Sequence, residues 1–329
     1  MLKLSILIPT YNRAQKLIRM LKNIETEIAR SDAANFLEVI VSDNASPDET
    51  KSAVEAFIPN GYKIRYFRQD VNVGFDRNIK FLYEQAKGDY VWYVSDDDIL
   101  LPGAIQEVVN GLKGTNPDVL LFSFEQPLGS TNRTFDLPES VSLVTNPEKI
   151  IELAAHYPKV TMYVVRKIDL TQYDWAEIEP FCGDGYFFVV LSYSILARSD
   201  QARLTVISKP LAASDDDFSH IHFSPYVLLN FYRVFLHPFV QNYLPNLANN
   251  QQRASYFSAI QLMFAIKLGA LTTDNEKQFN KDLNSFKMIP GYLVLNPRPL
   301  VQLVLLKTGL TQLYKIVKIA KNLLSNNKA

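Results

Sequence analysis

The stretch Leu4-Ser5-Ile6-Leu7-Ile8-Pro9-Thr10-Tyr11-Asn12-Arg13 passes from a short apolar run into a polar turn. The run Leu4–Ile8 has the length and the aliphatic content of a buried β-strand. Residues 14–29 repeat apolar side chains with helical spacing, and Glu38–Ser42 is again strand-like. A strand, a helix and a second strand in this order predict a right-handed crossover between two parallel strands.

The same alternation continues through the first 125 residues. The predicted strands are Leu4–Ile8, Glu38–Ser42, Lys63–Arg68, Tyr90–Val94 and Val119–Phe124. The predicted helices cover residues 14–29, 48–57, 75–86 and 102–112, the second with Ser46 as its cap and Pro47 at its first position. Short apolar strands between amphipathic helices predict an α/β fold, with helices on both faces of a mostly parallel sheet.

The alternation is lost after residue 125. Residues 126–180 contain several prolines and are typical of loops, apart from one predicted strand at Thr161–Arg166. Apolar runs return further on, and the last third of the chain is helical in pattern and rich in Lys and Arg. We therefore expect an α/β domain over residues 1–215 and a helical, basic region over residues 216–329.

Charge is balanced over the whole chain but not along it. The 329 residues hold 34 Lys and Arg against 34 Asp and Glu, and 47% are hydrophobic, which excludes a disordered, collagen-like or disulfide-rich protein. Residues 1–225 carry 22 basic and 31 acidic side chains, whereas residues 226–329 carry 12 and 3. The basic part predicts an anionic partner, namely nucleic acid, an acidic protein or a membrane surface.

The end of the chain discriminates between these partners. At 100° per residue, Lys307, Lys315, Lys318 and Lys321 share one side of a predicted helix, and aliphatic residues occupy the other. This pattern favours either a helix lying in an anionic lipid interface or a helix packed on the protein with a solvated lysine face. Nucleic acid is not expected as a partner, because there are almost no aromatic residues for base stacking.

Several features bear on the cellular compartment. The N-terminus lacks the regions of a signal peptide, and no run of about 18–20 apolar residues predicts a membrane-spanning helix. Cys182 has no second cysteine to pair with, which favours a reducing compartment. We expect a cytoplasmic protein that does not cross the bilayer by itself.

Polar residues gather where four predicted strands end. Pro9–Arg13 follows the first strand, Asp43–Ser46 the second, Asn72–Asn78 the third and Ser95–Asp98 the fourth. Ligands of open parallel sheets bind outside the carboxyl ends of the strands. The sequence therefore predicts a binding site along this edge of the sheet.

Asp96, Asp97 and Asp98 are three consecutive carboxylates of this group. Carboxylates at such close range repel and raise each other's pKa. A divalent Mg²⁺ or Mn²⁺ ion shared with phosphate oxygens relieves the repulsion, and a solvated acidic turn is the alternative. No glycine-rich phosphate loop is present, so the metal and Arg13 or Arg77 would neutralise the phosphates. This combination predicts a nucleotide-sugar site.

Five blocks of this region together resemble the inverting family 2 of glycosyltransferases, which have the GT-A fold. The blocks are Ser5–Arg13, Val41–Ser46, Asn72–Asn78, Gly88–Tyr90 and Ser95–Asp98 with Pro102. Within the family, the pattern is similar to bacterial abequosyltransferase-like O-antigen enzymes. The resemblance covers about residues 3–125 and implies a GT-A domain, followed here by a helical C-terminal extension.

The resemblance implies roles for the residues that would meet the nucleotide. The first turn would hold the base and ribose through Pro9, Thr10, Tyr11 and Arg13. Asp43 would accept a hydrogen bond from the nucleobase, and Arg77 would lie near the base or the pyrophosphate. Taken singly, these residues also have ordinary explanations as turn residues or solvated charges, and it is their joint order over four strand ends that favours the site.

The same resemblance implies a separate role for each of the three consecutive aspartates. Asp97 would be the metal ligand, Asp96 a contact to the ribose or donor sugar, and Asp98 part of the metal shell or a group that positions the donor. Ser95 stands where many relatives have the first carboxylate of the motif.

An inverting transfer needs a base that deprotonates the acceptor hydroxyl. Asp184 stands where relatives of the family have an acidic residue, and it is our predicted base, with a simple turn aspartate as the alternative. His220 or His222 is a candidate metal ligand, with a surface loop as the alternative.

These observations predict an enzyme that transfers a sugar from a nucleoside diphosphate donor to a hydroxyl of a glycan or lipid-linked acceptor. The resemblance implies inversion and bacterial surface polysaccharide biosynthesis, with the protein peripheral on the inner face of the cell membrane. The alternatives are a nucleotidyltransferase and a relative that binds nucleotide-sugar or glycan without turnover.

Overall fold

The computed structural model describes most of the first 268 residues and a few positions beyond them. The described residues are 3–57, 62–125, 128, 137, 141–155, 159–172, 174–182, 185–198, 201–214, 220–221, 225–268, 272–273, 280–281, 302 and 305–306. The chain forms two compact units, one of Met1–Asp216 with Val234–Pro245 and one of Asp217–Arg233 with Asn246–Ala329. The expected division into a catalytic domain and a basic region stays a prediction.

The first unit is built on a nine-stranded sheet. Its strands are β1 (Leu4–Thr10), β2 (Leu37–Asp43), β3 (Ile64–Arg68), β4 (Tyr90–Tyr93), β5 (Asp98–Leu100), β6 (Val119–Glu125), β7 (Val141–Val144), β8 (Tyr163–Arg166) and β9 (Leu204–Ser214). Their order is β3-β2-β1-β4-β8-β6-β9-β5, and β7 pairs with β9. β1 to β4 are parallel, as are β6 and β9, whereas β8, β5 and β7 pair antiparallel with their neighbours. The predicted α/β fold with a mostly parallel sheet is confirmed.

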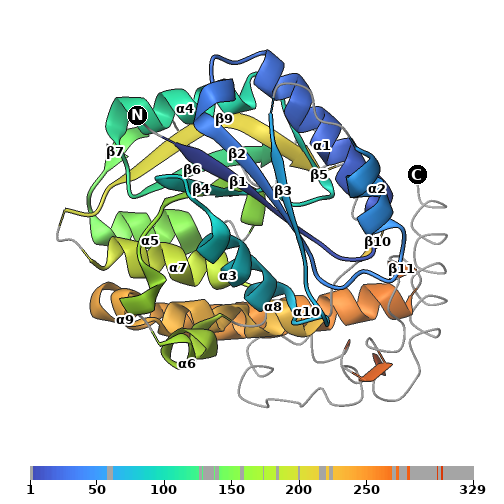
Figure 1. Cartoon of the computed structure of the whole chain (residues 1–329). Helices are drawn as coiled ribbons and strands as arrows, with labels where there is room; N and C mark the ends of the chain where they lie inside the picture. The colour runs from blue at the N-terminus through green and yellow to red at the C-terminus, as the bar shows by residue number, and fades with distance from the viewer. Residues whose placement is uncertain are drawn as a thin grey trace, which may run out of the picture. The chain divides into compact units, whose positions relative to one another are not determined.

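Helices cover both faces of this sheet. They are α1 (Ala14–Ala29), α2 (Thr50–Ala56), α3 (Phe75–Gln85), α4 (Ala104–Thr115), α5 (Pro147–Ala155), α6 (Trp175–Ile178), α7 (Phe187–Leu196) and α9 (Pro238–Tyr243). Short 3-10 helices span Ala34–Phe36, Val160–Met162, Leu170–Gln172, Glu179–Phe181 and Phe231–Leu236. Figure 1 shows α1 and α4 on one side of the sheet and α3 and α7 on the other. The central strands β1 and β4 are therefore buried along their whole length, whereas the edge strand β3 is only partly buried and carries Arg65 and Arg68.

The core explains the apolar runs of the sequence. All seven residues of β1 are buried, as expected of a parallel strand in the middle of a covered sheet. Trp92 of β4 packs edge-to-face on Phe122 of β6, with ring centroids 5.8 Å apart, and its indole N–H donates to the carbonyl oxygen of Thr161 over 2.8 Å. Every residue of Phe187–Leu196 is buried, which is why this helix is apolar on all sides.

Two local predictions are wrong. Residues 126–180 are not only loop around one strand, because Val141–Val144 is a strand and Pro147–Ala155 is a helix. Ser46 does not cap α2: Asp48 accepts from the backbone N–H of Thr50 over 3.1 Å, while the Ser46 hydroxyl is used elsewhere. The Ser46 hydroxyl instead accepts a hydrogen bond from the Asn12 N–H, and α2 begins later than predicted, at Thr50.

The second unit contains helices α8 (Pro225–Asn230) and α10 (Leu247–Lys267) and a parallel pair of short strands, β10 (His220–Ile221) and β11 (Thr272–Thr273). A buried cluster on α10 centres on Ile260, Met263 and Phe264, with Leu229 of α8 packed against it. No helix among the described residues is long and apolar enough to span a bilayer. The predicted lysine-faced helix after Lys307 lies outside the described residues.

Candidate active site

The carboxyl ends of neighbouring parallel strands meet at one edge of the sheet. Thr10, at the end of β1, is the register partner of Asp43 at the end of β2, and β4 pairs on the other side of β1. We define the rim as residues 10–13, 43–46 and 95–98, which end or follow these three strands. The topology thus brings together polar segments that are up to 86 residues apart in sequence.

Asp96 lies at the centre of the rim with 2% of its surface exposed. Its Oδ2 accepts a hydrogen bond of 2.6 Å from the Thr10 hydroxyl, and its Oδ1 accepts one of 3.0 Å from Arg13. Burial raises the pKa of Asp96 to about 6, because the Arg13 charge offsets only part of the lost hydration and Asp97 adds repulsion.

Asp97 is the most accessible carboxylate of the triplet, with 18% of its side chain exposed. Arg13 donates to its Oδ2 over 3.0 Å and the Ser95 hydroxyl to its Oδ1 over 2.5 Å. Arg19, from α1, donates to its main-chain oxygen over 3.1 Å. Burial acts to raise the pKa of Asp97, but Arg13 and Ser95 outweigh it and the pKa is lowered. This carboxylate is therefore ionised at neutral pH.

Asp98 faces the interior. It is 4% exposed and begins β5, where its register partner is Ser214 of β9. The Thr161 hydroxyl donates to its Oδ2. Burial and the nearby Asp97 charge raise the pKa of Asp98 to about 7, against the opposing charge of Lys159. The predicted place of Asp98 in a metal shell stays a prediction.

Asp43 is fully buried and joins three segments. One carboxylate oxygen accepts from the Ser46 N–H over 2.7 Å, which closes the turn after β2. The other accepts from the Tyr66 hydroxyl over 2.8 Å and from Arg68 over 3.1 Å, both on β3. The sequence did not reveal Tyr66 and Arg68 as partners, because strand pairing rather than spacing brings them there. The nucleobase contact of Asp43 stays a prediction.

Two non-glycine residues of the rim have left-handed backbones. Asn12 has a φ of 55° and Ala45 a φ of 64°, and such conformations at non-glycine residues cluster at functional sites. The Asn12 N–H donates to the Ser46 hydroxyl over 2.8 Å, which ties the first turn to the second. The Asn44 side chain accepts from the Val73 N–H over 2.9 Å and so ties the second turn to the loop before α3.

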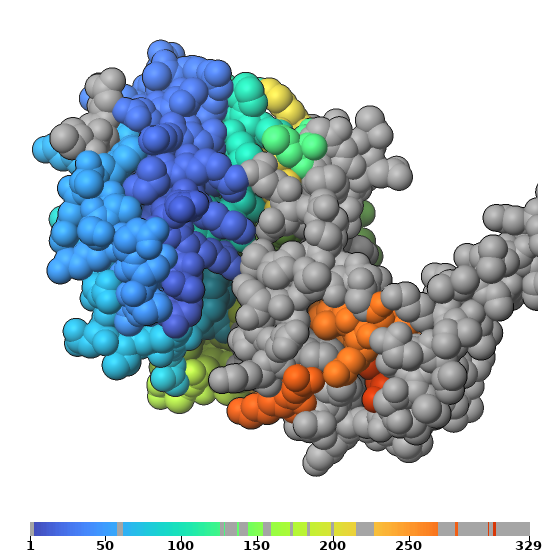
Figure 2. All heavy atoms as spheres, turned by 90° about the vertical axis from the view of Figure 1, so that its right-hand side faces the viewer, coloured from blue at the N-terminus to red at the C-terminus, as the bar shows by residue number. Residues whose placement is uncertain are grey.

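Large apolar side chains are exposed beside these turns. Tyr11 is 44% exposed, Phe75 at the start of α3 is 42% exposed, and Val71 after β3 is 65% exposed. Pro9, in contrast, is buried in β1. The N-terminal segments that carry these residues, in shades of blue, form a continuous part of the surface in Figure 2. Sequence analysis selected Tyr11 but missed Phe75 and Val71, since single exposed apolar residues carry no pattern.

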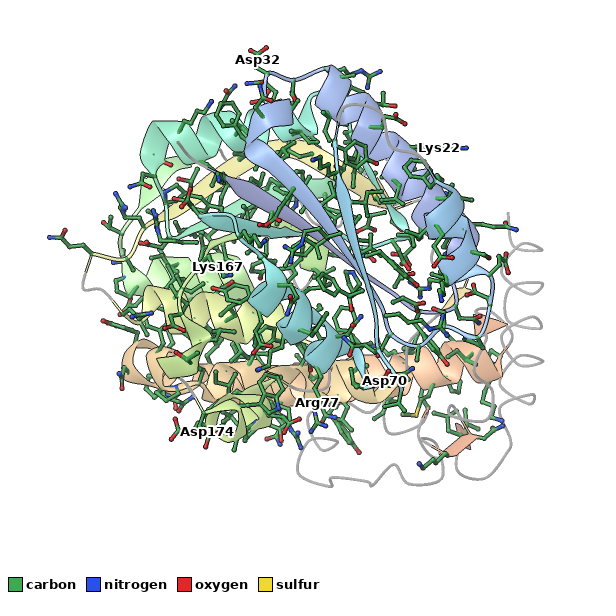
Figure 3. All side chains as sticks on the ribbon, in the orientation of Figure 1. Lys22, Asp32, Asp70, Arg77, Lys167 and Asp174 are labelled. Carbon is green, nitrogen blue, oxygen red and sulfur yellow. The ribbon has the colours of Figure 1, made fainter. Side chains whose placement is uncertain are left out.

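Arg77 lies on α3 with 60% of its side chain exposed. Its guanidinium pairs with Glu179 at 2.9 Å. Figure 3 shows it projecting from the helix, and its predicted place near the base or pyrophosphate stays a prediction.

No cluster of three His, Cys, Asp or Glu side chains with metal-binding geometry exists among the described residues. The donor set still fits a magnesium-type site, in which one or two carboxylates bind the ion and phosphates and water complete its shell. Asp97 is ionised, reachable from solvent and beside the buried Asp96. The predicted base Asp184 and the candidate ligand His222 lie outside the described residues, as does the side chain of His220.

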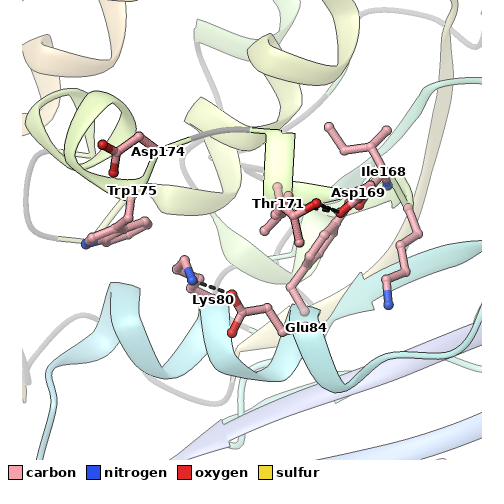
Figure 4. A pocket seen from close by; sticks show the side chains of 10 residues that line it. Lys80, Glu84, Ile168, Asp169, Thr171, Asp174 and Trp175 are labelled. Carbon is pink, nitrogen blue, oxygen red and sulfur yellow. Dashed lines mark hydrogen bonds and ion pairs between the residues drawn. The ribbon is translucent and has the colours of Figure 1, made fainter.

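A separate pocket of about 510 Å³ lies between α3 and the segment after β8. Its lining residues are Lys80, Tyr83, Glu84, Lys167, Ile168, Asp169, Leu170, Thr171, Asp174 and Trp175. Figure 4 shows that Lys80 pairs with Glu84 on α3 and that the Thr171 hydroxyl donates to Asp169 in the segment after β8. Since β8 runs antiparallel to β4, residues after β8 lie at the edge of the sheet opposite the rim.

A family model assigns the chain to a class of sugar-transferring enzymes. The family described as Glycosyl transferase family 2 matches residues 5–175, just over half of the chain, and the protein belongs to this family. The predicted family and the GT-A-type α/β fold are thus confirmed.

Two curated relatives illustrate the similarity. The GalNAc(5)-diNAcBac-PP-undecaprenol beta-1,3-glucosyltransferase of Campylobacter jejuni is 36% identical over 108 residues, which are 32% of this chain and 33% of that protein. Abequosyltransferase RfbV of Salmonella typhimurium is 37% identical over 99 residues, or 30% of this chain and 28% of that protein. The matching segment thus spans about a third of the length of these relatives.

Solved structures share the fold at low sequence identity. Staphylococcus aureus TarS 1-349 in complex with UDP superposes with a TM-score of 0.53 and 18% identity, covering 87% of this chain and 76% of that chain. Mannosyltransferase PcManGT from Pyrobaculum calidifontis, in complex with GDP-Man and Mn²⁺, superposes with a TM-score of 0.51 and 15% identity. The superposition covers 98% of this chain and 87% of that chain.

Proposed function

We propose that this protein transfers a sugar, with inversion, from a nucleoside diphosphate donor to a hydroxyl of a glycan or lipid-linked acceptor. The observation that carries the proposal is the rim, where Thr10, Arg13 and Asp97 converge around the buried Asp96. Membership of the family supports the reaction type. The structures with bound UDP and GDP-Man support the donor class, and the names of the two curated relatives support the acceptor class.

The nucleotide would lie along the ends of β1 and β2. The exposed ring of Tyr11 offers a stacking surface for the base, as does Phe75 at the start of α3. The rigid turn closed by Asp43 and Ser46 would place main-chain groups toward the ribose and base. Arg77 carries a largely exposed guanidinium, which would pair with a phosphate of the donor in place of Glu179.

The diphosphate is the leaving group, and its charge grows as the sugar bond breaks. Asp97, with Asp96 behind it, would hold a Mg²⁺ or Mn²⁺ ion that stabilises this charge when bound. Thr10 keeps Asp96 in place, and Ser95 orients Asp97. Asp184 would accept the proton of the acceptor hydroxyl as that oxygen attacks the anomeric carbon, and an attack opposite the diphosphate gives inversion.

The protein would act in surface polysaccharide biosynthesis, at the inner face of the cell membrane. The excess of basic residues after residue 225 supports binding to an anionic surface. We expect sedimentation with phosphatidylglycerol vesicles and not with phosphatidylcholine vesicles. Replacing Lys315, Lys318 and Lys321 together by Gln should weaken this binding, and unchanged sedimentation of that variant would contradict a role for the C-terminal lysines.

The donor site is tested by thermal shift with UDP, GDP, CDP and dTDP, each with and without Mn²⁺. We expect one of them to raise the melting temperature by several degrees in a Mn²⁺-dependent manner. Asp97→Asn should abolish the Mn²⁺-dependent part. Asp32→Asn makes the same change at an exposed position remote from the rim and should behave as the wild type (Figure 3).

Donor turnover separates the candidate functions. A glycosyltransferase should release the nucleoside diphosphate slowly from the matching sugar nucleotide in the presence of Mn²⁺, and Asp97→Asn should lose this hydrolysis. Release of pyrophosphate from a nucleoside triphosphate would favour a nucleotidyltransferase. Nucleotide binding without turnover of any donor, with or without oligosaccharide acceptors, would favour a binding protein.

A further inference from the structure

One nitrogen of Arg13 bridges two carboxylates of the rim. Nη1 lies 3.0 Å from Oδ1 of Asp96 and 3.0 Å from Oδ2 of Asp97. The side chains of Asp96 and Asp97 are 3% and 18% exposed, so two neighbouring charges are held with little access to water. The guanidinium thus supplies a positive charge in direct contact with both carboxylates, and the charges of Lys16 and Lys159 also act on Asp97.

The remaining oxygens of both carboxylates are also hydrogen-bonded. Thr10 occupies Oδ2 of Asp96 and Ser95 occupies Oδ1 of Asp97. Thr10 is 3% exposed and belongs to β1, so its contact is part of the folded sheet. The Arg13 side chain is 29% exposed and stands at the first turn of α1, outside the strand. Unlike Thr10, Arg13 therefore contacts Asp96 from outside the sheet.

A metal ion bound through Oδ2 of Asp97 would compete with the Arg13 bridge, which uses the same oxygen. Two cations within bonding distance of one oxygen would repel strongly at a site with little water. Resting on the proposed metal-dependent transfer, we propose that Arg13 is an internal counter-cation that leaves Asp97 when the metal binds and then pairs with the diphosphate of the donor. The protein exchanges one cation for another at the same carboxylate.

The place of Arg13 suits its second partner. It is the residue directly before α1, where the helix dipole favours an anion. Its planar guanidinium forms paired hydrogen bonds with phosphate oxygens. Arg19 is not equivalent, because it holds the main-chain oxygen of Asp97 rather than the carboxylate.

The exchange makes metal and nucleotide binding cooperative. Metal alone must displace Arg13 from two carboxylates, so it should bind weakly. With a nucleoside diphosphate present, the displaced guanidinium gains new partners, and the metal should bind more tightly. By linkage, the metal must raise nucleotide affinity by the same factor.

The test measures Mn²⁺ affinity by EPR titration without nucleotide, which needs no activity. Arg13→Gln should bind Mn²⁺ about tenfold or more tightly than the wild type, because the competing charge is gone. Arg13→Lys retains a cation and should remain close to the wild type. Lys22→Gln removes one positive charge from an exposed position on the same helix and should also leave Mn²⁺ affinity unchanged (Figure 3).

The second measurement repeats the titration with UDP or GDP, whichever stabilises the wild type. The factor by which the nucleotide tightens Mn²⁺ binding should be about tenfold or more in the wild type and should shrink in Arg13→Gln. Equal Mn²⁺ affinity of Arg13→Gln and the wild type, with nucleotide-dependent Mn²⁺ binding intact, would overturn the exchange and leave the proposed function standing. Absence of Mn²⁺ binding in both proteins, even with nucleotide, would reject the metal site and the exchange together.

Discussion

The Thr10 hydroxyl donates a hydrogen bond of 2.6 Å to Oδ2 of Asp96 and so joins the end of β1 to the segment after β4. Both residues are almost fully buried, at 3% and 2% exposure. A buried carboxylate that loses a hydrogen-bond donor destabilises the folded state. The contact between Thr10 and Asp96 therefore contributes to stability as well as to the geometry of the rim.

Thr10→Val removes the donor while keeping the shape of the side chain. We expect the free energy of unfolding to fall by about 1–3 kcal/mol, because one oxygen of Asp96 is left without a partner. Loss of this bond also raises the pKa of Asp96 further. Urea unfolding measures the loss. Thr10→Ser keeps the hydroxyl and should lose less stability than Thr10→Val, and equal losses would show that the methyl group matters as much as the hydrogen bond.

Asp43→Asn tests the hub between β2 and β3. One carboxylate oxygen becomes an NH2 group, so either the Ser46 N–H or the Tyr66 hydroxyl and Arg68 lose their acceptor, and Arg68 also loses the opposite charge. We expect a loss of about 2–3 kcal/mol in unfolding free energy, less than for a fully buried pair because Arg68 is 37% exposed.

Asp70→Asn is the matched control for this variant. Asp70 is exposed two residues after β3, and its substitution should change the unfolding free energy by at most about 0.5 kcal/mol (Figure 3). Similar losses in both variants would contradict a special role for the Asp43 network.

Gly88 cannot accommodate a side chain. A Cβ atom there would lie 2.7 Å from the Ser5 hydroxyl and 2.8 Å from both the Ser5 nitrogen and the Tyr90 oxygen, two of which belong to the backbone. Gly88→Ala should therefore cost about 1–3 kcal/mol, as overpacked sites do. Gly114→Ala places the same methyl group in open space on α4 and should stabilise by about 0.5 kcal/mol. Thermal unfolding that ranks the two variants otherwise would refute the predicted clash.

Stability should depend on pH through His237. Burial lowers the pKa of this histidine from 6.5 to about 4, and its ring accepts from the Phe239 N–H at the start of α9. Between pH 6.5 and 4 the unfolded chain binds the proton and the folded chain does not, so stability is lost as the pH falls through this window. The loss should be on the order of 1–3 kcal/mol, since the ring is partly exposed.

His237→Asn isolates this contribution. Asparagine retains a side-chain acceptor for the helix start but does not titrate. The decline in melting temperature between pH 6.5 and 4 should therefore be smaller in the variant than in the wild type. Parallel pH profiles would assign the decline to other groups.

Sequence reasoning found elements whose signal is local. The strand at Leu4–Ile8 and the helix over residues 14–29 are confirmed by β1 and α1, because an apolar run and a helical repeat each reflect the face that a segment buries. The helix Pro147–Ala155 was missed, since nearby prolines and glycines suggested loops. Ser46 was predicted to cap the following helix, whereas its hydroxyl accepts from the Asn12 N–H. A serine that caps a helix and a serine that stabilises a turn cannot be told apart in the sequence.

The sequence by itself determined the family, the parallel sheet and the grouping of polar residues at the strand ends, because strand and helix periods and the order of the motif blocks are properties of the chain alone. Only the tertiary structure decided which of these residues meet. Strand pairing places Thr10 against Asp96, Tyr66 and Arg68 against Asp43, and Arg13 between Asp96 and Asp97. Contacts between residues 20 to 90 positions apart depend on the register of the sheet, and burial, which sets the pKa of each carboxylate, exists only after the chain has folded.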